Sequence, residues 1–317
     1  FIMTTNKVLP FDLAFVNAMR VNVSAVLRRT QTLGARRTFK VESQVAAYLR
    51  AVQCLDLTTL SGADTPERVR RLCKKALTPV DPHILDQLGI SSYPLTVGAV
   101  CVYDAMILTA VQALQGRVPV AAVSTGFPAG QSLFYLKLRE IEASVESGAN
   151  EIDVVITRSL VHKGKWRELY DEIKAFRELC GAEVKMKTIL GVGDLEELEK
   201  VAKAGAVAIM AGSDFIKTST GFEPTNATLE TGLVMARVIR HFRDSHAIKV
   251  GLKPAGGIRS AKDAMLWLTL MLEELGEEWT KPALFRIGAS GLLIDIDRQL
   301  SHCATGRYSA AHHHAMG

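Results

Sequence analysis

The sequence predicts an α/β fold, specifically a (β/α)8 TIM barrel with an N-terminal helical extension. Three observations support this prediction. From about residue 50, short runs of apolar and β-branched residues alternate with amphipathic stretches. Eight such runs occur, which is the strand number of this barrel. Their residues are apolar without alternation, as expected for parallel strands that are buried on both faces.

The eight expected strands leave room for a helix between most neighbours. They are Val52–Thr58, Thr96–Val102, Val120–Ser124, Glu151–Ile156, Val184–Leu190, Phe215–Thr218, Lys249–Pro254 and Phe285–Gly288. A doubly wound open sheet is the main alternative. It would need only about six strands, and no Gly-x-Gly-x-x-Gly motif follows the first run. The barrel is therefore favoured.

Helix-forming stretches lie between the expected strands. Asp64-Thr-Pro-Glu places a capping residue ahead of Pro66, a favoured first helical position. Ser260-Ala-Lys-Asp263 resembles a capping box that opens the following helix. The longer expected helices are Gln131–Glu146, Trp166–Leu179, Leu195–Ala204, Thr225–Phe242 and Ala261–Leu275.

One barrel domain with additions at both ends is the expected organisation. Residues 1–50 contain the helical patterns Ala25–Leu33 and Val41–Ala51, and we expect them to form a helical layer that caps the barrel. Residues 51–308 form the barrel, and residues 309–317 form a tail. The three histidines of the tail are typical of a cloning or purification remnant rather than of a metal site.

Composition limits the classes of function. Hydrophobic residues make up 48% of the 317, which is enough for a large core, and no apolar run approaches the roughly 20 residues that span a bilayer. The first residues lack the apolar region of a signal peptide. Five widely spaced cysteines without a C-x-x-C motif predict a reduced, cytoplasmic protein without a zinc site. No membrane partner is expected.

The net charge of +5 comes partly from short basic clusters. The cluster from Arg68 to Lys75 fits a solvated helix face, because Val69, Leu72 and Ala76 repeat at helical spacing. No nucleic-acid-binding motif accompanies these clusters, so we expect no nucleic-acid partner.

Polar residues interrupt several expected strands near the carboxyl ends, where barrel active sites lie. They are Asp56, Cys101, Asp153, Lys187, Lys217, Lys253 and Ser290. Any one of them could equally be a solvated strand end or part of a buried ion pair. Burying a lysine costs several kcal/mol unless it is paired or neutral. Three strand lysines and two strand aspartates together therefore favour a functional site.

Lys217 is the candidate nucleophile of this site. A lysine near other cations and out of water has a lowered pKa, so that its free amine can attack an aldehyde. Lys217 and Lys253 are expected on adjacent strands, where one can be neutral while the other stays charged. Asp153, with one of the lysines, can hold the water that moves protons. Cys101 lacks an obvious histidine partner and fits a small buried neighbour better than a nucleophile.

Three small-residue turns follow the last three expected strands. They are Ser219-Thr-Gly221, Ala255-Gly256-Gly257 and Gly288-Ala-Ser290. Glycines let backbone N–H groups approach an anion, and barrels commonly bind phosphate near their last two strands. The three turns together indicate a phosphorylated substrate. The Gly126-Phe-Pro-Ala-Gly segment is ambiguous, and we interpret it as a structural loop.

Six motifs resemble those of the 2-deoxyribose-5-phosphate aldolase family. They are Asp-Leu-Thr-Thr-Leu (56–60), Ala-Val-Cys-Val-Tyr (99–103), Gly-Ala-Asn-Glu-Ile-Asp-Val-Val (148–155), Gly-Ser-Asp-Phe-Ile-Lys-Thr-Ser-Thr-Gly (212–221), Lys-Pro-Ala-Gly-Gly-Ile-Arg (253–259) and Phe-Arg-Ile-Gly-Ala-Ser (285–290). Arg28-Arg29 and Thr-Gly-Arg-Tyr (305–308) resemble its eukaryotic branch. The likeness extends over about residues 20 to 308.

The resemblance implies a class I lyase that reversibly cleaves 2-deoxy-D-ribose 5-phosphate to acetaldehyde and D-glyceraldehyde 3-phosphate, without a metal or other cofactor. It places the imine lysine at Lys217, the lysine that perturbs it at Lys253 and the proton-relay aspartate at Asp153. The implied substrate-binding positions are Asp56, Thr58, Cys101, Lys187, Thr218, Gly221, Gly256, Gly257 and Ser290.

Several positions depart from the family pattern. Phe222 stands where the family usually has a lysine, and Gly291 stands where it usually has a second serine. The loop after Lys187 reads Val192-Gly-Asp-Leu rather than Thr-Gly-Glu-Leu, and Leu252 replaces a phenylalanine. No tyrosine follows Tyr308 in the tail, where many members use one to move a proton.

These departures leave two functions open. The first is an active aldolase acting on a small-molecule sugar phosphate, with a homodimer as one assembly it could adopt. The second is a divergent homologue, weak or inactive on the phosphate ester, that binds a protein partner as a scaffold. Loss of one charge-assisted hydrogen bond at Phe222 would weaken phosphate binding about tenfold or more. An isomerase or epimerase is less favoured, because no Glu or His base stands at a strand end.

Overall fold

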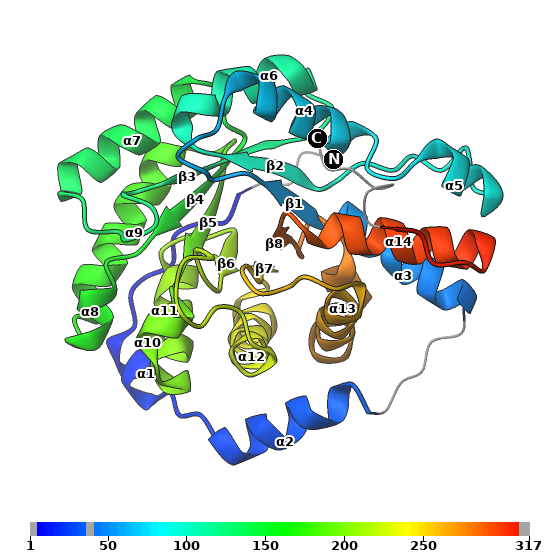
Figure 1. Ribbon diagram of the computed structural model, residues 1–317. Helices are drawn as coiled ribbons and strands as arrows, with labels where there is room; N and C mark the ends of the chain where they lie inside the picture. Colours follow the sequence, from blue (N-terminus) through cyan, green and yellow to red (C-terminus); the bar gives the residue numbers. More distant parts are fainter. Residues whose placement is uncertain (1–4, 36–40, 311–317) are drawn as a thin grey trace.

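Eight parallel strands surround a common axis and are themselves surrounded by helices (Figure 1). The computed structural model describes residues 5–35 and 41–310. The strands are β1 (Leu55–Thr58), β2 (Ala99–Val102), β3 (Val120–Ser124), β4 (Glu151–Val155), β5 (Lys185–Ile189), β6 (Phe215–Lys217), β7 (Gly251–Lys253) and β8 (Ile287–Ala289). They pair in the order β7-β6-β5-β4-β3-β2-β1-β8. Parallel bridges from Leu252 to Phe285 and from Ala255 to Gly288 join the two edges, so the predicted barrel is confirmed.

All eight predicted strands are present, and most are shorter than predicted. Both β1 and β2 begin three residues later than predicted, and at β1 the sequence placed the strand start at Val52. Val52 instead belongs to helix α3 (Val41–Gln53), and the strand begins at Leu55. A short apolar run satisfies either a buried helix or a buried strand, so its pattern could not locate the junction.

Helices alternate with the strands around the barrel. They are α4 (Pro66–Leu77), α5 (Pro82–Gln87), α6 (Ile107–Leu114), α7 (Phe134–Glu146), α8 (Arg158–His162), α9 (Trp166–Cys180), α10 (Val192–Leu195), α11 (Leu198–Met210), α12 (Leu229–His246), α13 (Ala261–Leu275) and α14 (Leu292–Thr305), with short 3-10 turns at Asp104–Met106 (η1) and Glu277–Thr280 (η2). Ser260 and Asp263 form the predicted capping box of α13. At α4 the capping residue is Thr65, directly before Pro66, which opens the helix as predicted.

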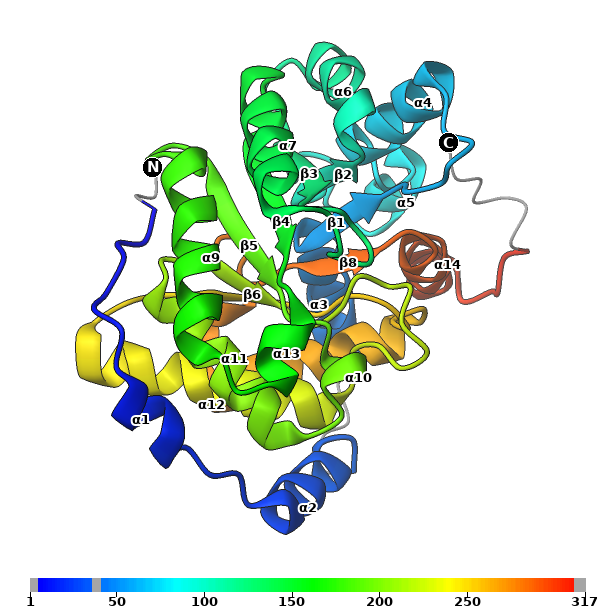
Figure 2. The ribbon, with the colours of Figure 1, turned by 90° about the vertical axis from the view of Figure 1, so that its left-hand side faces the viewer.

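The first two helices of the N-terminal segment pack on the outside of the helical ring. Helix α1 (Leu13–Ala18) contacts α9 and α11, and α2 (Val23–Leu33) contacts α12 and α13 (Figures 1 and 2). Polar bonds fix this arrangement. The Tyr170 hydroxyl donates to the Leu9 carbonyl at 2.6 Å, and Arg29 pairs with Glu273 at 2.6 Å and with Glu274 at 3.0 Å. The histidines of the tail lie outside the described residues.

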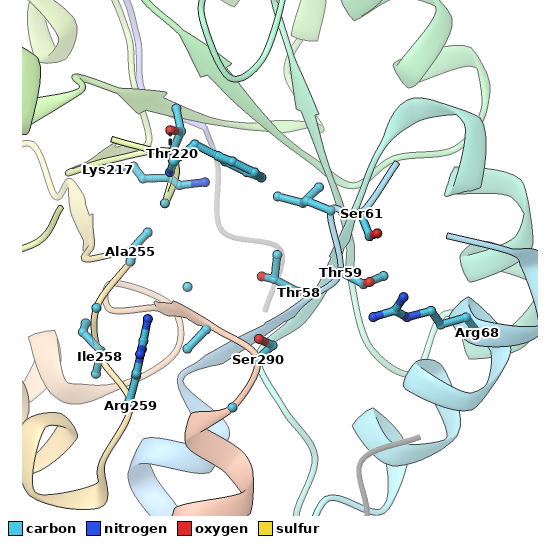
Figure 3. Close-up of a pocket in the computed structure, with 18 residues that line it drawn as sticks. Thr58, Thr59, Ser61, Arg68, Lys217, Thr220, Ala255, Ile258, Arg259 and Ser290 are labelled. Carbon is cyan, nitrogen blue, oxygen red and sulfur yellow. Dashed lines mark hydrogen bonds between the residues drawn. The ribbon is translucent and has the colours of Figure 1, made fainter. Parts of the chain in front are cut away.

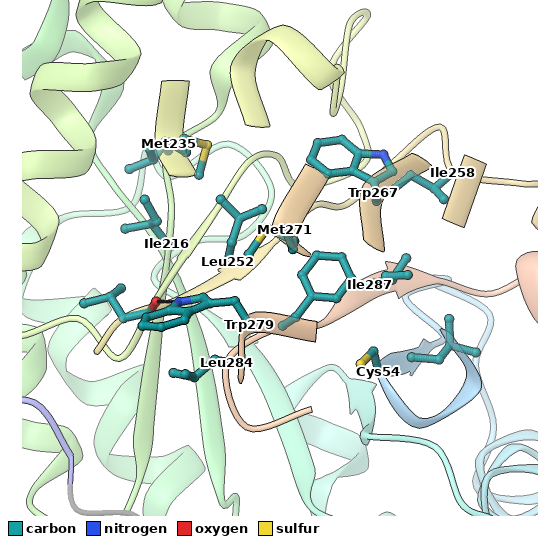
Figure 4. Close-up of a cluster of buried hydrophobic side chains, with 14 of the residues drawn as sticks. Cys54, Ile216, Met235, Leu252, Ile258, Trp267, Met271, Trp279, Leu284 and Ile287 are labelled. Carbon is teal, nitrogen blue, oxygen red and sulfur yellow. Dashed lines mark hydrogen bonds between the residues drawn. The ribbon is translucent and has the colours of Figure 1, made fainter. Parts of the chain in front are cut away.

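The main hydrophobic core lies between the strands and their helices. Figure 4 shows one part of it, where Ile216 and Leu252 of the sheet meet Met235, Trp267 and Met271 of α12 and α13. The barrel interior is different. A small second cluster, which includes Cys101, Val123 and Phe127, shares it with charged side chains. In the described part of the chain, no helix is long and apolar enough to cross a membrane.

Candidate active site

Seven charged side chains meet inside the barrel, and we call them the interior charge network. They are Asp56, Glu151, Asp153, Lys187, Lys217, Lys253 and Arg286. None is more than 4% exposed. They point inward because alternate residues of a strand share a face, as Glu151 and Asp153 do on β4. Strand pairing places Asp153 beside Lys187, and Lys217 beside Lys253.

Asp153 is the carboxylate that the three lysines of this network share. Its Oδ2 accepts hydrogen bonds from Nζ of Lys217 and from Nζ of Lys253, each at 2.7 Å. Its Oδ1 accepts from Nζ of Lys187 at 2.9 Å. Three ammonium groups on three neighbouring strands therefore share one carboxylate. Their combined charge holds the pKa of Asp153 well below its usual value despite its burial.

The other ion pairs of the network involve Asp56, Glu151 and Arg286. Lys187 lies 2.6 Å from Glu151 and 3.3 Å from Asp56, and Lys253 lies 2.5 Å from Asp56. Arg286 reaches Asp56 at 2.7 Å and Glu151 at 2.8 Å. These contacts raise the pKa of Lys187 and that of Lys253, even though burial opposes it. Both lysines therefore stay charged at neutral pH.

The network holds four basic groups and three carboxylates, so one positive charge is in excess. Of the four basic groups, Lys217 is the one whose pKa is lowered. Burial lowers its pKa below 10.5, the ion pair with Asp153 works against this shift, and the nearby charge of Lys253 adds to it. Neutral Lys217 would give the buried network an equal number of positive and negative charges. The geometry thus favours a free amine at this one position.

A cavity of about 750 Å³ opens above the network at the carboxyl ends of β1, β6, β7 and β8 (Figure 3). Its lining residues are Thr58, Thr59, Leu60, Ser61, Arg68, Lys217, Thr220, Gly221, Phe222, Ala255, Gly256, Gly257, Ile258, Arg259, Gly288, Ala289, Ser290 and Gly291. Lys217 is the member of the interior charge network that lines it. The amine is therefore accessible from the cavity, while its carboxylate partner Asp153 lies beneath it and is fully buried.

The loop after β6 is closed on itself by a carboxylate. Glu223 accepts hydrogen bonds from the backbone N–H of Thr220 at 3.0 Å and of Gly221 at 3.2 Å, and from the Thr220 hydroxyl at 2.8 Å. Phe222 is 59% exposed and packs edge-on against Phe127, with ring centroids 5.7 Å apart. This loop, where the sequence predicted phosphate binding, already holds an anion of its own.

The loops after β7 and β8 are more open. Gly256 has φ +80°, and a Cβ there would lie 2.6 Å from the side chain of Asn226, so only glycine fits. Gly257 also has a positive φ, +83°, but has free space around its Cα. Ser290 and Gly291 precede α14, which has no side-chain hydrogen bond at its N-cap. Backbone N–H groups of a helix start favour a negatively charged ligand.

The structure brings most of the predicted site residues together. Thr58, Lys217, Gly221, Gly256, Gly257 and Ser290 line the cavity. Asp56, Cys101, Asp153, Lys187 and Lys253 lie in the barrel interior below it. Thr218 does not line the cavity. Its hydroxyl accepts from the Ala255 N–H at 3.0 Å, which ties the end of β6 to that of β7. Burial raises the pKa of the Cys101 thiol, which suits a buried neighbour more than a nucleophile.

Sequence reasoning missed several groups at this site. Glu151 could have been found, since it lies two residues before Asp153 on the same strand face. Arg286 and Phe127 gave no comparable signal, and Phe127 lies in the loop that was interpreted as structural. Its ring is 5.9 Å from Nζ of Lys217. Arg68 was assigned to a solvated helix face, but its side chain lines the cavity. Among residues 5–35 and 41–310, no group of three or more His, Cys, Asp or Glu side chains is arranged to hold a metal ion.

A barrel with a buried, amine-bearing cavity at the carboxyl ends of its strands has the architecture of a barrel enzyme. The family model described as "DeoC/LacD family aldolase" matches residues 50–290. The chain therefore belongs to the DeoC/LacD aldolase family, and it is an enzyme of the lyase class.

Named relatives agree with this assignment. The chain is 54% identical over 304 residues to a deoxyribose-phosphate aldolase of Bos taurus, covering 95% of each chain. It is 53% identical over 310 residues to that of Homo sapiens, covering 97% of each. Among solved structures, the deoxyribose phosphate aldolase of Aeropyrum pernix has a TM-score of 0.60 at 23% identity, covering 88% of this chain and 99% of that chain. This last likeness concerns the fold alone.

Proposed function

We propose that this protein reversibly cleaves 2-deoxy-D-ribose 5-phosphate into acetaldehyde and D-glyceraldehyde 3-phosphate, through an imine on Lys217. The observation that carries the proposal is the placement of Lys217. Its amine lines the cavity, is 2.7 Å from Asp153 and has a lowered pKa. The names of relatives with more than half of their residues identical support the choice of substrate.

The first step is attack on the open-chain aldehyde of the sugar. The neutral amine of Lys217 adds to C1 and forms a carbinolamine, which loses one water to give a protonated imine. Each stage moves a proton onto or off the nitrogen or the departing oxygen. Asp153 accepts a hydrogen bond from Nζ of Lys217 and is held ionised by Lys187 and Lys253, so it can receive these protons, directly or through a water.

The second step breaks the bond between C2 and C3. The C3 hydroxyl gives its proton to Asp153, directly or through a water, and becomes the aldehyde of glyceraldehyde 3-phosphate. The electron pair of the broken bond moves into the iminium group and leaves an enamine on Lys217. The enamine takes a proton at its terminal carbon, and the water released earlier is matched by one that hydrolyses the imine. Acetaldehyde and free Lys217 result.

Lys253 and Asp153 act together beneath this chemistry in our proposal. Lys253 stays charged because Asp56 and Asp153 both contact it, at 2.5 and 2.7 Å. Its fixed positive charge disfavours protonation of Lys217 and stabilises the carboxylate that receives protons. Lys187 supports the same arrangement from β5, and neither it nor Cys101 of β2 lines the cavity.

The phosphate would lie at the β7 and β8 turns. Gly256, Gly257 and Ser290 line the cavity there, and an anion at this place faces the start of α14. The turn after β6 contributes Gly221 to the wall, but the N–H of Gly221 donates to Glu223. A cytoplasmic location and a homodimer also belong to this proposal. Free cysteines at five positions, four of them buried, support a reducing compartment.

Turnover of the sugar phosphate tests the proposed function. The purified chain is mixed with 2-deoxyribose 5-phosphate, and the two products are measured with separate coupled assays for each aldehyde. Equal amounts of both aldehydes, and resynthesis of the substrate when both are supplied, are expected. If neither direction proceeds while the fold is intact, the scaffold alternative replaces the aldolase. Reaction with acetaldehyde alone, without turnover of the phosphate ester, would locate the defect in the rim of the cavity.

A further inference from the structure

The charges that line the cavity all have one sign. Of the described residues in its wall, the charged ones are Arg68, Lys217 and Arg259, and none is acidic. Lys217 is committed to Asp153 at the floor of the cavity. The other two guanidinium groups point into the cavity from α4 and from the loop after β7 (Figure 3). A cavity with this charge distribution favours a substrate that carries a negative group away from its reacting end.

Arg68 is held in place by a buried carboxylate. Its Nε lies 3.4 Å from Oδ1 of Asp64, whose side chain is only 5% exposed. Asp64 in turn accepts from the Thr59 hydroxyl at 2.8 Å and from the Ser61 N–H at 3.0 Å. This ion pair engages one edge of the guanidinium. Because the group has five N–H donors, the others can bind a second acceptor in the cavity.

The wall opposite Arg68 offers little to an anion. Glu223 occupies the N–H groups of Thr220 and Gly221, as described above. Phe222, an exposed aromatic side chain without a charge, lines the cavity beside them. A phosphate placed there would meet a carboxylate and an aromatic ring. The cationic groups on the other walls therefore decide where a phosphate can bind.

We propose that Arg68 is a specificity-determining residue whose guanidinium binds the substrate phosphate from the β1 side of the cavity, next to the β8 turn at Ser290. The proposal rests on the function proposed above. A guanidinium can form two parallel hydrogen bonds to a phosphate, which a point charge cannot. Arg68 thereby supplies a cation to a cavity in which position 222 is an uncharged phenylalanine. It acts in binding and selection, not at the reacting carbons.

Binding of 2-deoxyribitol 5-phosphate tests this assignment without the imine. This reduced analogue has the phosphate and lacks the aldehyde, so that its dissociation constant does not depend on Lys217 chemistry. We expect Arg68→Gln to raise the dissociation constant about tenfold or more, and Arg68→Lys to raise it less. Arg71→Gln is the matched control, because Arg71 lies on the same helix and is exposed outside the cavity. It is expected to bind like the wild type.

The substrate preference gives a second measurement. Arg68→Gln should lower the ratio of kcat/KM for 2-deoxyribose 5-phosphate over 2-deoxyribose about tenfold, mainly through KM. A dissociation constant within twofold of wild type in folded Arg68→Gln, or an equal loss in Arg71→Gln, would overturn the proposal. If the wild type fails to turn over substrate yet Arg68→Gln still weakens binding of the analogue, the proposed reaction fails and the phosphate site stands.

Discussion

The interior charge network and the rim of the cavity differ in how their polar groups are satisfied. Inside the barrel, each ammonium, guanidinium and carboxylate group has an oppositely charged partner within 3.5 Å, on strands that are packed on both sides. At the rim, Arg68 is about half exposed and Phe222 is 59% exposed. Interior changes should therefore cost both stability and chemistry, whereas rim changes should cost binding alone.

Loss of the amine is expected to have the largest effect. Lys217→Met keeps the volume of the side chain and removes the nucleophile, so that turnover should fall below detection while the fold persists. Lys249→Met is the control, since Lys249 is about half exposed and pairs only at the surface with Glu278. Product formation in a coupled assay is the measurement. Residual turnover by Lys217→Met above that of a buffer blank would contradict the role of the amine.

Asp153→Asn is expected to have the second-largest effect and to reduce both the activity and the stability of the protein. It leaves three buried lysine side chains with a weaker common partner. We expect kcat to fall about 10²- to 10⁴-fold, as for loss of a general base, and the free energy of unfolding to fall by about 3–5 kcal/mol. Urea denaturation and initial rates measure the two. Asp171→Asn, which alters an exposed pair with Arg167, should change neither.

The pH dependence of the rate tests the charge balance. The rate should rise with pH as Lys217 loses its proton, with a midpoint below the usual lysine pKa of 10.5, because burial and Lys253 lower its pKa. Glu151→Gln removes one negative charge from the network, which favours neutral Lys217 further. The midpoint should then move to lower pH, by on the order of one unit. A shift to higher pH would contradict this balance, and the surface variant Glu168→Gln should show no shift.

The smallest effect is expected at the rim. Phe222→Lys places a cation beside the cavity, and it should lower KM for the phosphorylated sugar about two- to fivefold, since exposed ion pairs contribute only about 0–1 kcal/mol. Phe222→Leu separates the charge from the loss of the aromatic ring. KM values for the two variants and wild type are compared at low salt. An unchanged KM in Phe222→Lys would show that this wall does not contact the phosphate.

The barrel could be predicted because its signals are local. Continuous apolar runs, a capping box and proline at a helix start are all visible within a few residues. The lysines and aspartates of the interior were visible for the same reason, as polar residues in apolar strands. Their proximity could be inferred from strand order, since Lys217 and Lys253 fall on neighbouring strands.

The features that could not be predicted from the sequence depend on contacts between distant segments. Arg286 meets Asp56 across 230 residues of sequence, and no local pattern reports that pair. The sequence did not show that the Glu223 carboxylate accepts hydrogen bonds from its own loop, because an acidic residue in a turn is ordinarily solvated. Arg68 lies on an amphipathic helix, and its helical spacing could not show that the first turn faces the cavity.

Reductive trapping tests the central claim most directly. The protein is incubated with acetaldehyde, reduced with borohydride and digested, and the modified peptide is found by mass. We predict a single ethyl adduct on Lys217, whose amine lines the cavity and has the lowered pKa, and none on Lys187 or Lys253, which are charged and enclosed. An adduct on another lysine of the barrel, or none in a folded sample, would contradict the account.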